Sequence, residues 1–555
     1  IVLFLFVLML IDLNEEQKVS LLSIIKNLRI LDPAVGSGHF LIDSILSLEA
    51  IYHYLYNANI IGWSKFEIRE HIIKQNLFGV DILPGAIEIC KLRMFLALAE
   101  TFETKEDIHP LPNIEFNFRV GNSLIGFVSK NEINQNFISD GTIINTISKN
   151  IRFLRKYFPD LANKISNIIG NPFNMDPLDL FEVRNDLVEF YRTPHNDKDF
   201  QMELREVVND ITNSFNKELN IQFYSKFIHS LGSKNELKKL NESEKKRIFL
   251  DLMPFHWIME FSEIMKNGGF DVIIENPPYI RVHNLAYLES DFMKNSYKTP
   301  IGKYDIYIVF YERSFDLITN NGKIGIISSS SFLKVDYGEK LRELLFNFRL
   351  VDRIVDFGHN QIFKDVSTYT LILLGSKEDL KKEHFEYIKI KYQEDRSKIS
   401  LSEIEIHKTN RYNEFSSSSW NLMLSSNISV FLTNNHEASG NLFYTRSPLF
   451  TGADELLIKE NQDKLEYLNE GIWKSVIRPK DIKIWKFKKI NEKVFFPYTK
   501  NNHNYKLIDE NEFKNKYPNS YEYLIQHKTK LLERKDSRKT FIELKRPWYS
   551  LMRTG

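Results

Sequence analysis

Residues 270–281 read FDVIIENPPYIR, an apolar run that stops at an asparagine, two prolines and a tyrosine. The first residues of this run have the continuous Val/Ile character of a parallel β-strand that is covered on both faces. Pro277 and Pro278 cannot donate hydrogen bonds to a neighbouring strand, so strand pairing must end before them. Each proline also holds the residue before it in an extended conformation, which fixes the carbonyl groups of Asn276 and Pro277. The sequence therefore predicts a buried strand that ends at a rigid polar corner where a ligand is positioned.

Strand-like and helical segments alternate on either side of this run. The stretch LRILDPAVGSGHF at 28–40 is a short strand and a glycine loop, after which apolar residues recur at helical spacing. The stretch NLFGVD at 76–81 repeats the pattern, and Pro84 stands where the first turn of a helix tolerates proline. Further strand-like runs lie at 114–126, 322–332, 353–363 and 367–375. This alternation predicts an α/β fold with a doubly wound, Rossmann-like sheet.

The length of 555 residues exceeds that of one ordinary core, so the chain should contain several domains. We expect residues 1–126 and 255–400 to form the two halves of the sheet domain. Residues 127–254 lack strand-like alternation over most of their length and predict a helical insertion. The exposed-looking NEFSSSSW at 413–420 precedes a C-terminal domain expected at 425–555.

Charge is spread unevenly along the chain. Residues 471–555 hold 21 lysines and arginines against 9 aspartates and glutamates, a net charge of +12. Because the whole chain carries +1, the first 470 residues carry −11. This asymmetry predicts an anionic partner for the C-terminal part, although a solvated basic face would show the same charge.

The composition of the chain argues against several classes of protein. The single cysteine, Cys90, excludes a disulfide framework and a cysteine-based zinc cluster. The 14 histidines show no HExxH-like spacing, so no metal is expected. The apolar stretch IVLFLFVLML at 1–10 is much shorter than the roughly 20 residues of a spanning helix, and no membrane role is expected.

The ends of the first two expected strands carry candidate ligand-binding groups. In open α/β sheets a ligand lies beyond the carboxyl ends of the strands, where Gly36 and Gly38 would let it approach the backbone closely. Asp81 ends the second strand and can accept hydrogen bonds from both hydroxyls of a ribose. Asp32 precedes the glycine loop and can face an ammonium group. Each aspartate alone is as readily a turn residue, but their placement at successive strand ends favours a nucleoside-binding site.

Four motifs together resemble a known family. DPAVGSG at 32–38, FGVD at 78–81, GNSLIG at 121–126 and NPPY at 276–279 occur in the order of the gamma-type adenine-N6 DNA methyltransferases. The sequence around them, such as GGFDVIIENPPYIR and KYDIYIVFYERSFDLI, resembles the methylase part of type IIG restriction-modification enzymes. The resemblance is strong over about residues 28–376 and looser over 440–555.

The resemblance implies S-adenosyl-L-methionine as cofactor and a flipped adenine as target. Asn276 and Pro277, with Pro278 holding the corner, would accept the two N–H groups of the adenine amine, and Tyr279 would stack on the base. Phe363, in FGHNQIF, would cover the other face of the base. Asn122 stands where many relatives have an aspartate for the cofactor adenine, and its amide oxygen can accept the same hydrogen bond. The implied cofactor-binding residues are Asp32, Pro33, Gly36, Gly38, Asp81 and Asn122.

The resemblance also implies partners and a location. RPKDIKIWKFKK at 478–489, EKVFFPYTK at 492–500 and KRPWYSLMRTG at 545–555 interleave cations with aromatic residues and resemble a target-recognition domain for double-stranded DNA. The further cofactor motif expected before DPAVGSG is not matched, the N-terminal nuclease domain of type IIG enzymes is missing, and the recognition domain ends early. A separate nuclease or restriction subunit is therefore a candidate partner, in the cytoplasm of a prokaryotic cell.

Three functions remain open from the sequence. The first is a site-specific adenine-N6 DNA methyltransferase of a restriction-modification system. The second is a protein glutamine or RNA methyltransferase, because NPPY also presents two acceptors to a planar amide or to a guanine amine. The third is a non-catalytic DNA-binding remnant. The large basic C-terminal part favours the first over the second.

Overall fold

The structure is a computed structural model in which the chain forms two compact units, Ile1–Phe431 and Leu432–Gly555. The apolar stretch 1–10 lies outside the described residues, and most of 478–489 does too. The described residues are 13–104, 111–133, 142–170, 177–192, 197–232, 240–363, 369–377, 382–395, 398–412, 415, 420, 422, 449–460, 465–477, 482–483, 486–487, 492–501, 504–536 and 539–553.

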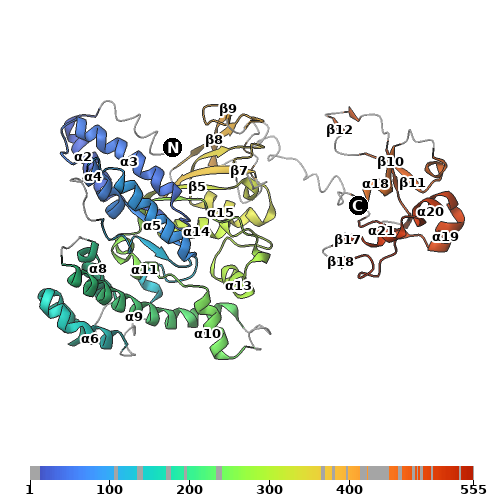
Figure 1. The fold of residues 1–555 in the computed structure, drawn as a ribbon. Helices are drawn as coiled ribbons and strands as arrows, with labels where there is room; N and C mark the ends of the chain where they lie inside the picture. Colours follow the sequence, from blue (N-terminus) through green and yellow to red (C-terminus); the bar gives the residue numbers. More distant parts are fainter. Residues whose placement is uncertain are drawn as a thin grey trace. The chain divides into compact units, whose positions relative to one another are not determined.

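Among these residues, the larger unit holds a sheet of nine strands (Figure 1). The strands are β1 (Ile30–Asp32), β2 (Leu77–Asp81), β3 (Phe118–Val120), β4 (Phe270–Glu275), β5 (Ile318–Ser329), β6 (Val351–Asp356), β7 (Thr370–Ser376), β8 (His384–Ile390) and β9 (Ile404–Arg411). They are ordered β3-β2-β1-β4-β5-β7-β6-β8-β9 in space. Strands β1 to β5 are parallel, whereas β7 is antiparallel to both of its neighbours. The predicted doubly wound α/β sheet is thereby confirmed.

The first strand lies at the point where the chain changes direction across the sheet. From β1 the chain adds β2 and β3 on one side, and it then adds β4 and β5 on the other. Leu31 of β1 is in register with Phe78 of β2 and with Ile273 of β4. In open α/β sheets such a switch point, outside the carboxyl ends of the strands, is where ligands bind.

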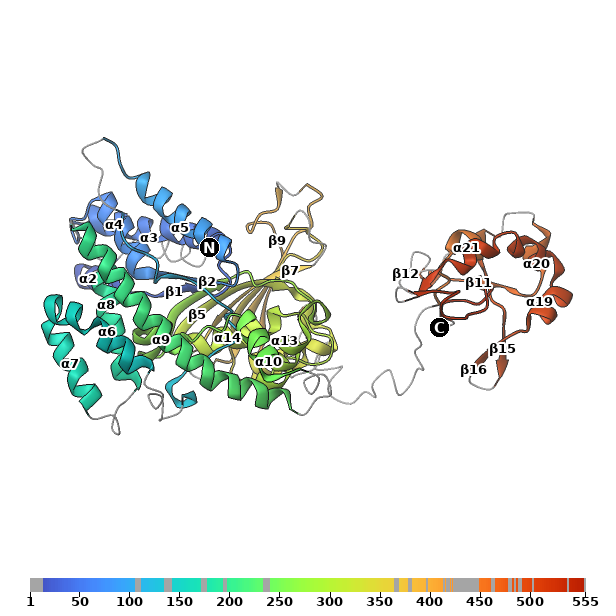
Figure 2. The ribbon, with the colours of Figure 1, turned by 60° about the horizontal axis from the view of Figure 1, so that its bottom comes forward.

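Helices cover both faces of the sheet because the strand side chains are apolar on both faces. The helices α2 (Glu15–Asn27), α3 (His39–Asn57), α4 (Lys65–His71) and α5 (Pro84–Ala99) share a core with one face of β1 and β2. The other face packs on α11 (Trp257–Glu260), α12 (Ser262–Lys266), α13 (Tyr287–Ser296), α14 (Tyr307–Leu317) and α15 (Glu339–Asn347). Figure 2 shows α3 and α5 on one side of the sheet and α9 on the other.

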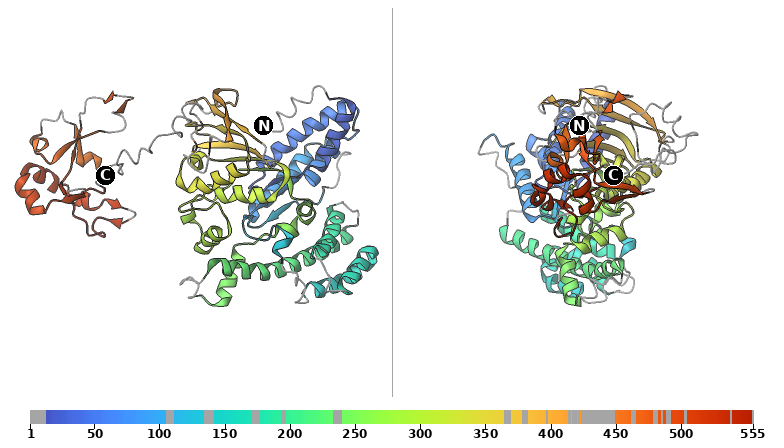
Figure 3. Two further views of the ribbon diagram at one scale, coloured as in Figure 1. Left: turned by 180° about the vertical axis from the view of Figure 1, so that it is seen from behind. Right: turned by 90° about the vertical axis from the view of Figure 1, so that its right-hand side faces the viewer.

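A group of helices lies between β3 and β4 in the chain. They are α6 (Thr142–Tyr157), α7 (Pro159–Gly170), α8 (Pro177–Arg192), α9 (Lys198–Leu231) and α10 (Glu242–Asp251), seen together in the left view of Figure 3. Their apolar residues belong to the same core as Leu31 and Ile273 of the sheet. A buried ion pair between Arg184 of α8 and Glu260 of α11, 3.1 Å long, also joins the two parts. The helical insertion is therefore built into the sheet domain.

The second unit has a core of its own. An antiparallel sheet contains β10 (Ile458–Glu460), β14 (Glu492–Phe495) and β11 (Trp473–Val476), in that order. The hairpins are β12 (Ile482–Lys483) with β13 (Lys486–Phe487), β15 (Tyr498–Asn501) with β16 (Asn504–Leu507), and β17 (Lys535–Asp536) with β18 (Lys539–Thr540). The helices are α18 (Asp454–Leu457), α19 (Glu510–Lys516), α20 (Pro518–Ile525) and α21 (Lys528–Leu532). Across the described parts of both units, no helix has the length and apolar character to cross a membrane.

Candidate active site

Four candidate residues form the corner after β4. The strand ends at Glu275, and Asn276, Pro277, Pro278 and Tyr279 follow it. Pro277 is buried and the other three are half-buried. Oδ1 of Asn276 is buried and accepts no hydrogen bond from any described residue. An unpaired buried acceptor costs about 1–3 kcal/mol, so this oxygen is suited to a donor supplied by a ligand.

Three candidate polar residues lie on one face of the sheet at its carboxyl edge. Side chains alternate between the two faces along a strand. Asp32, Asp81 and Asn276 each come two or four residues after a residue that packs in the core beneath α3 and α5. Those core residues are Ile30, Leu77 and Ile274. Because β2, β1 and β4 are adjacent and parallel, the three polar groups lie at the same edge of the sheet. Asp32 is level with Gly79 of β2, so Asp81 lies two residues further along its strand.

The glycine loop after β1 is held by the end of β2. Oδ2 of Asp81 accepts a hydrogen bond from the Gly36 N–H at 2.9 Å, and Oδ1 accepts one from the Leu83 N–H at 2.9 Å. Each carboxylate oxygen keeps a further lone pair, and Asp81 is partly exposed. Gly36 and Gly38 have φ of +53° and +85°, and a Cβ at Gly38 would meet Sγ of Cys90 at 2.7 Å. The loop therefore requires glycine at both positions.

Asp32 is a buried carboxyl group beside this loop. It is 1% exposed, and its Oδ1 accepts a hydrogen bond from the Ala34 N–H at 3.0 Å. Burial raises the pKa of Asp32 to about 8, against the lowering effect of the Ala34 hydrogen bond, and nearby Asp81 adds to the rise. The next residue, Pro33, is buried, and its carbonyl oxygen accepts a hydrogen bond from the Ser123 hydroxyl at 2.5 Å. A cationic group near Asp32 would favour the carboxylate form.

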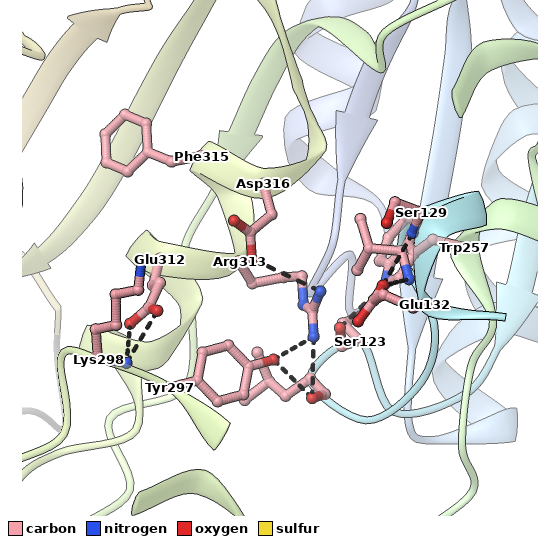
Figure 4. Close-up of polar contacts among 12 residues, drawn as sticks. Ser123, Ser129, Glu132, Trp257, Tyr297, Lys298, Glu312, Arg313, Phe315 and Asp316 are labelled. Atoms are coloured by element: carbon pink, nitrogen blue, oxygen red, sulfur yellow. Dashed lines mark hydrogen bonds and ion pairs between the residues drawn. The ribbon is translucent and has the colours of Figure 1, made fainter. Parts of the chain in front are cut away.

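The loop 121–126, which carries GNSLIG, is fixed by contacts with distant segments. The Trp257 indole N–H donates to the Ser123 carbonyl at 3.1 Å. The Leu124 carbonyl accepts from the Tyr297 hydroxyl at 2.6 Å and from Arg313 of α14 at 3.3 Å. Figure 4 shows Arg313 between Asp316 and Tyr297, beside the segment that carries Ser123. These contacts join the end of β3 to the half of the domain that contains β4.

Asn122 already uses its amide group within the protein. Its Oδ1 accepts a hydrogen bond from the Leu124 N–H at 3.1 Å, and its Nδ2 donates to Glu289 of α13 at 3.4 Å. The residue is 6% exposed. An amide oxygen has two lone pairs, so one remains for a ligand. The role of Asn122 toward a cofactor adenine therefore stays a prediction.

Tyr279 borders a polar cavity of about 460 Å³ at the carboxyl ends of β4 and β5. Its hydroxyl donates to the Ile327 carbonyl at 3.2 Å, and burial raises its pKa. Tyr337 and Tyr369 also line this cavity, whereas Phe363 is half-buried and does not belong to its lining. The stacking role expected of Phe363 thus stays a prediction, and Tyr369 is an exposed aromatic residue close to Tyr279 that the sequence analysis did not identify.

Glu275, directly before Asn276, is a second residue that sequence reasoning missed. It is 1% exposed, its Oε1 accepts a hydrogen bond from the Ser314 hydroxyl at 2.7 Å, and its Oε2 has no partner among the described residues. Burial holds its pKa well above the usual range, and the charge of Asp32 adds to the rise. Strand alternation turns Glu275 toward α14 and away from the face of Asn276. A charged residue at the end of the apolar run 272–274 was the available signal.

Three aromatic residues of the basic C-terminal stretches are core residues. Phe495, Trp548 and Tyr549 are each at most 4% exposed and pack in the core of the second unit. The expectation of an aromatic and basic surface is therefore wrong for these side chains. Arg534 is also buried, and its guanidinium donates to four backbone carbonyls, those of Leu531, Thr451, Trp548 and Ser550. Burial lowers its pKa to about 10.

Comparison with known proteins agrees with this arrangement. A family profile described as the Eco57I restriction-modification methylase matches residues 75–363, which run from two residues before β2 through the corner after β4 to Phe363. The chain belongs to this methylase family. The predicted resemblance to restriction-modification methylases is thereby confirmed, and the glycine loop before residue 75 lies outside the matched range.

Two curated relatives are named as both restriction enzyme and methyltransferase. A putative type II restriction enzyme and methyltransferase of Methanocaldococcus jannaschii, RM.MjaORFECS2P, is 33% identical over 367 residues, which cover 62% of this chain and 30% of the relative. The type II restriction enzyme and methyltransferase RM.Eco57I of Escherichia coli is 28% identical over 316 residues, which cover 51% of this chain and 31% of the relative. The chain thus spans about a third of the length of these relatives.

Among solved structures, the type IIL restriction-modification enzyme MmeI in complex with DNA aligns with 87% of this chain and 47% of its own. The TM-score is 0.38 and the sequence identity 10%. Values this low do not establish a shared fold. The topology of the methylase sheet is instead established by the strand order given above.

Proposed function

We propose that this chain is a site-specific DNA methyltransferase of a restriction-modification system, which transfers a methyl group from S-adenosyl-L-methionine to the N6 amino group of adenine in double-stranded DNA. One observation carries the proposal. Asp32 and Asp81 end two adjacent parallel strands, Asn276 directly follows a third at the switch point of the sheet, and the Asn276 acceptor is buried without a partner among the described residues.

The residues around the glycine loop fit S-adenosyl-L-methionine. Where a side chain would begin at Gly36, no atom lies within 4 Å, so a ligand can reach the backbone there. Asp81 retains one lone pair on each oxygen for two hydroxyl donors, and Asp32 offers a carboxyl group to an ammonium. The bound cofactor supplies an electrophilic methyl group. The protein's part is to hold it at the switch point against the target amine.

The corner after β4 would orient the amine. An exocyclic amine of adenine is a weak nucleophile because its lone pair is delocalised into the ring. Two fixed acceptors, Oδ1 of Asn276 and the carbonyl oxygen of Pro277, would accept its two N–H groups and favour a tetrahedral nitrogen whose lone pair is no longer delocalised into the ring. Tyr279 would stack on the base, which must leave the duplex because its amine is otherwise paired.

DNA is the favoured substrate because of the second unit. The region 471–555 has a net charge of +12, which suits a polyanion. A protein glutamine or RNA methyltransferase would use the same acceptors, but it would leave this basic unit without a role. Action on chromosomal DNA would place the protein in the cytoplasm of a prokaryotic cell, and a separate nuclease or restriction subunit would be its partner in restriction.

Label transfer tests the proposal. The chain is incubated with methyl-labelled S-adenosyl-L-methionine and, in parallel, unmodified duplex DNA, RNA or a protein lysate. We expect label in duplex DNA alone. Label in RNA or protein would contradict the proposed substrate, and cofactor binding without transfer to any acceptor would support a non-catalytic DNA-binding remnant.

A further inference from the structure

The polar cavity beside Tyr279 has a cationic side that the proposed methyl transfer does not use. It opens at the carboxyl ends of β4 and β5 and has a volume of about 460 Å³. Its lining includes Tyr279, Arg281, His283, Lys303, Asp305 and Tyr337. Arg281 lies two residues after Tyr279 in the chain, so any base stacked on Tyr279 would have this cation as a neighbour.

A short β-bridge joins the two segments that carry Arg281 and Lys303. Arg281 and Asp305 are paired in an antiparallel bridge. The Val282 N–H donates to the Tyr304 carbonyl at 2.9 Å, and the Ile306 N–H donates to the Ile280 carbonyl at 2.8 Å. Tyr304, the residue after Lys303, is completely buried, which anchors this segment. The backbones of Arg281 and Lys303 are therefore fixed relative to the catalytic corner.

Neither cation is neutralised by the part of the chain that the structure describes. Arg281 and Lys303 are exposed and form no ion pair with a described residue. The carboxylate that lines the same cavity, Asp305, accepts a hydrogen bond from the Tyr337 hydroxyl at 3.2 Å. Elsewhere in the unit, arginines beside carboxylates pair with them, as Arg69 does with Glu49 and Arg353 with Glu386. Arg281 and Lys303 thus keep their donors for another anion.

We infer that Arg281 and Lys303 bind a backbone phosphate next to the target adenine, on the strand that carries it. The inference rests on the proposed function and names the part of the DNA that this cavity would hold. A base that is extruded from the duplex stays attached to its sugar and two flanking phosphates, and these must enter the site with it. Phosphate contacts set the position and register of DNA on a protein. Arg281 and Lys303 would therefore fix the nucleotide while Tyr279 holds its base.

Neutral phosphates test this interaction directly. The target site is first located by sequencing of DNA that the chain has methylated. Duplexes of about 30 base pairs with that site are then made, each with a single methylphosphonate. In the test duplexes it replaces a phosphate on one side or the other of the target adenine, and in the control duplex it lies near one end. Methylation is measured at low DNA concentration for the wild type and for the double variant Arg281→Gln, Lys303→Gln. Lys217→Gln, an exposed lysine of α9, is the matched control.

The expected pattern is non-additive. A neutral phosphate next to the adenine removes one charge-assisted hydrogen bond, so the methylation rate of the wild type and of the Lys217→Gln control should fall about tenfold. A neutral phosphate near the end of the duplex should hardly change the rate. The double variant should already be at least about tenfold slower on ordinary DNA and should slow by no more than about twofold further. An additive effect in the double variant would overturn the assignment.

A binding measurement separates this inference from the proposed function. With a random-sequence duplex, log K against log salt should be less steep for the double variant by about 0.9 for each phosphate that it no longer neutralises, and unchanged for Lys217→Gln. An unchanged slope in the double variant would overturn the inference, even if the wild type methylates DNA. If the wild type transfers no methyl group to DNA, the proposed function fails while the slope still decides whether the two cations bind phosphate. A tenfold or greater loss of S-adenosyl-L-methionine affinity in the double variant would place the cofactor carboxylate in the cavity instead.

Discussion

The corner after β4 and the core of the second unit both contain buried polar groups, but these groups differ in their hydrogen-bond partners. At the corner, Oδ1 of Asn276 has no partner among the described residues. In the second unit, the Arg534 guanidinium donates to four backbone carbonyls. A buried polar group with all of its partners in the protein stabilises the fold, whereas one without a partner is available to a ligand. The contrast separates structural polar residues from functional ones.

Asn276→Ala should give the largest effect. Loss of a main acceptor for the target amine is expected to slow methyl transfer by roughly 10²-fold or more, with little change in S-adenosyl-L-methionine affinity. Single-turnover methylation and calorimetry measure the two quantities. Asn267→Ala, an exposed asparagine before the amino end of β4, is the control and should be unaffected. Retention of more than about a tenth of the rate would show that Asn276 is not a main acceptor.

Arg534→Met should act on stability alone. The apolar side chain fills similar space but leaves four buried carbonyls without their donor, which is expected to cost about 3 kcal/mol in the free energy of unfolding of the second unit. Denaturant unfolding followed by tryptophan fluorescence measures this decrease. Lys474→Met, at an exposed position of the same unit, should change the free energy by less than about 0.5 kcal/mol. Equal stability of the two variants would show that Arg534 does not stabilise the second unit and would contradict its structural role.

The exposed lysines of the second unit should act on DNA binding alone. Lys474, Lys500 and Lys506 are exposed, and the last two stand on the hairpin of β15 and β16. Replacing all three with glutamine should reduce the salt dependence of DNA affinity by about 0.9 in log K per log salt for each phosphate that these lysines neutralise. Thermal unfolding should not change. An unchanged salt dependence would place the DNA-binding cations elsewhere in the chain.

Asp32→Asn should act on the pH dependence of stability. Burial raises the pKa of Asp32 to about 8, so the folded protein retains a proton that the unfolded chain releases near pH 4. The folded state binds more protons between these values, and the free energy of unfolding of the ligand-free protein therefore falls as pH rises from about 4 to about 8. The decrease should be on the order of 1 kcal/mol per pH unit at most. Urea unfolding at pH 5 to 8 should show a flatter profile for Asp32→Asn, and parallel profiles would contradict a buried protonated Asp32.

The features that sequence could predict were those with a local cause. Pro277 and Pro278 end strand pairing, and β4 accordingly stops at Glu275. Apolar runs on both sides of glycine and proline gave the alternating strands and helices, and Asp32 and Asp81 were expected at strand ends where they are found. The parallel pairing of neighbouring strands could also be predicted from the helices between them, because a tight turn cannot connect two parallel strands.

The rest depends on contacts between residues far apart in the chain. Composition could not show that Trp548 and Tyr549 face inward, because an aromatic residue beside a cation is as readily part of a core as of a binding surface. It also could not place Arg281 and Lys303 at one cavity, because a bridge between Arg281 and Asp305 joins their separate segments. That Oδ1 of Asn276 lacks a partner among the described residues is likewise visible only in the folded structure.

The central claim is that this site methylates the N6 amine of adenine through Asn276. Its most direct test is mass spectrometry of the nucleosides released from duplex DNA after incubation with the chain and S-adenosyl-L-methionine that carries a deuterated methyl group. The account predicts deuterated N6-methyldeoxyadenosine for the wild type and at most about a hundredth of that product for Asn276→Ala. Label on cytosine, or an undiminished yield from the variant, would contradict it.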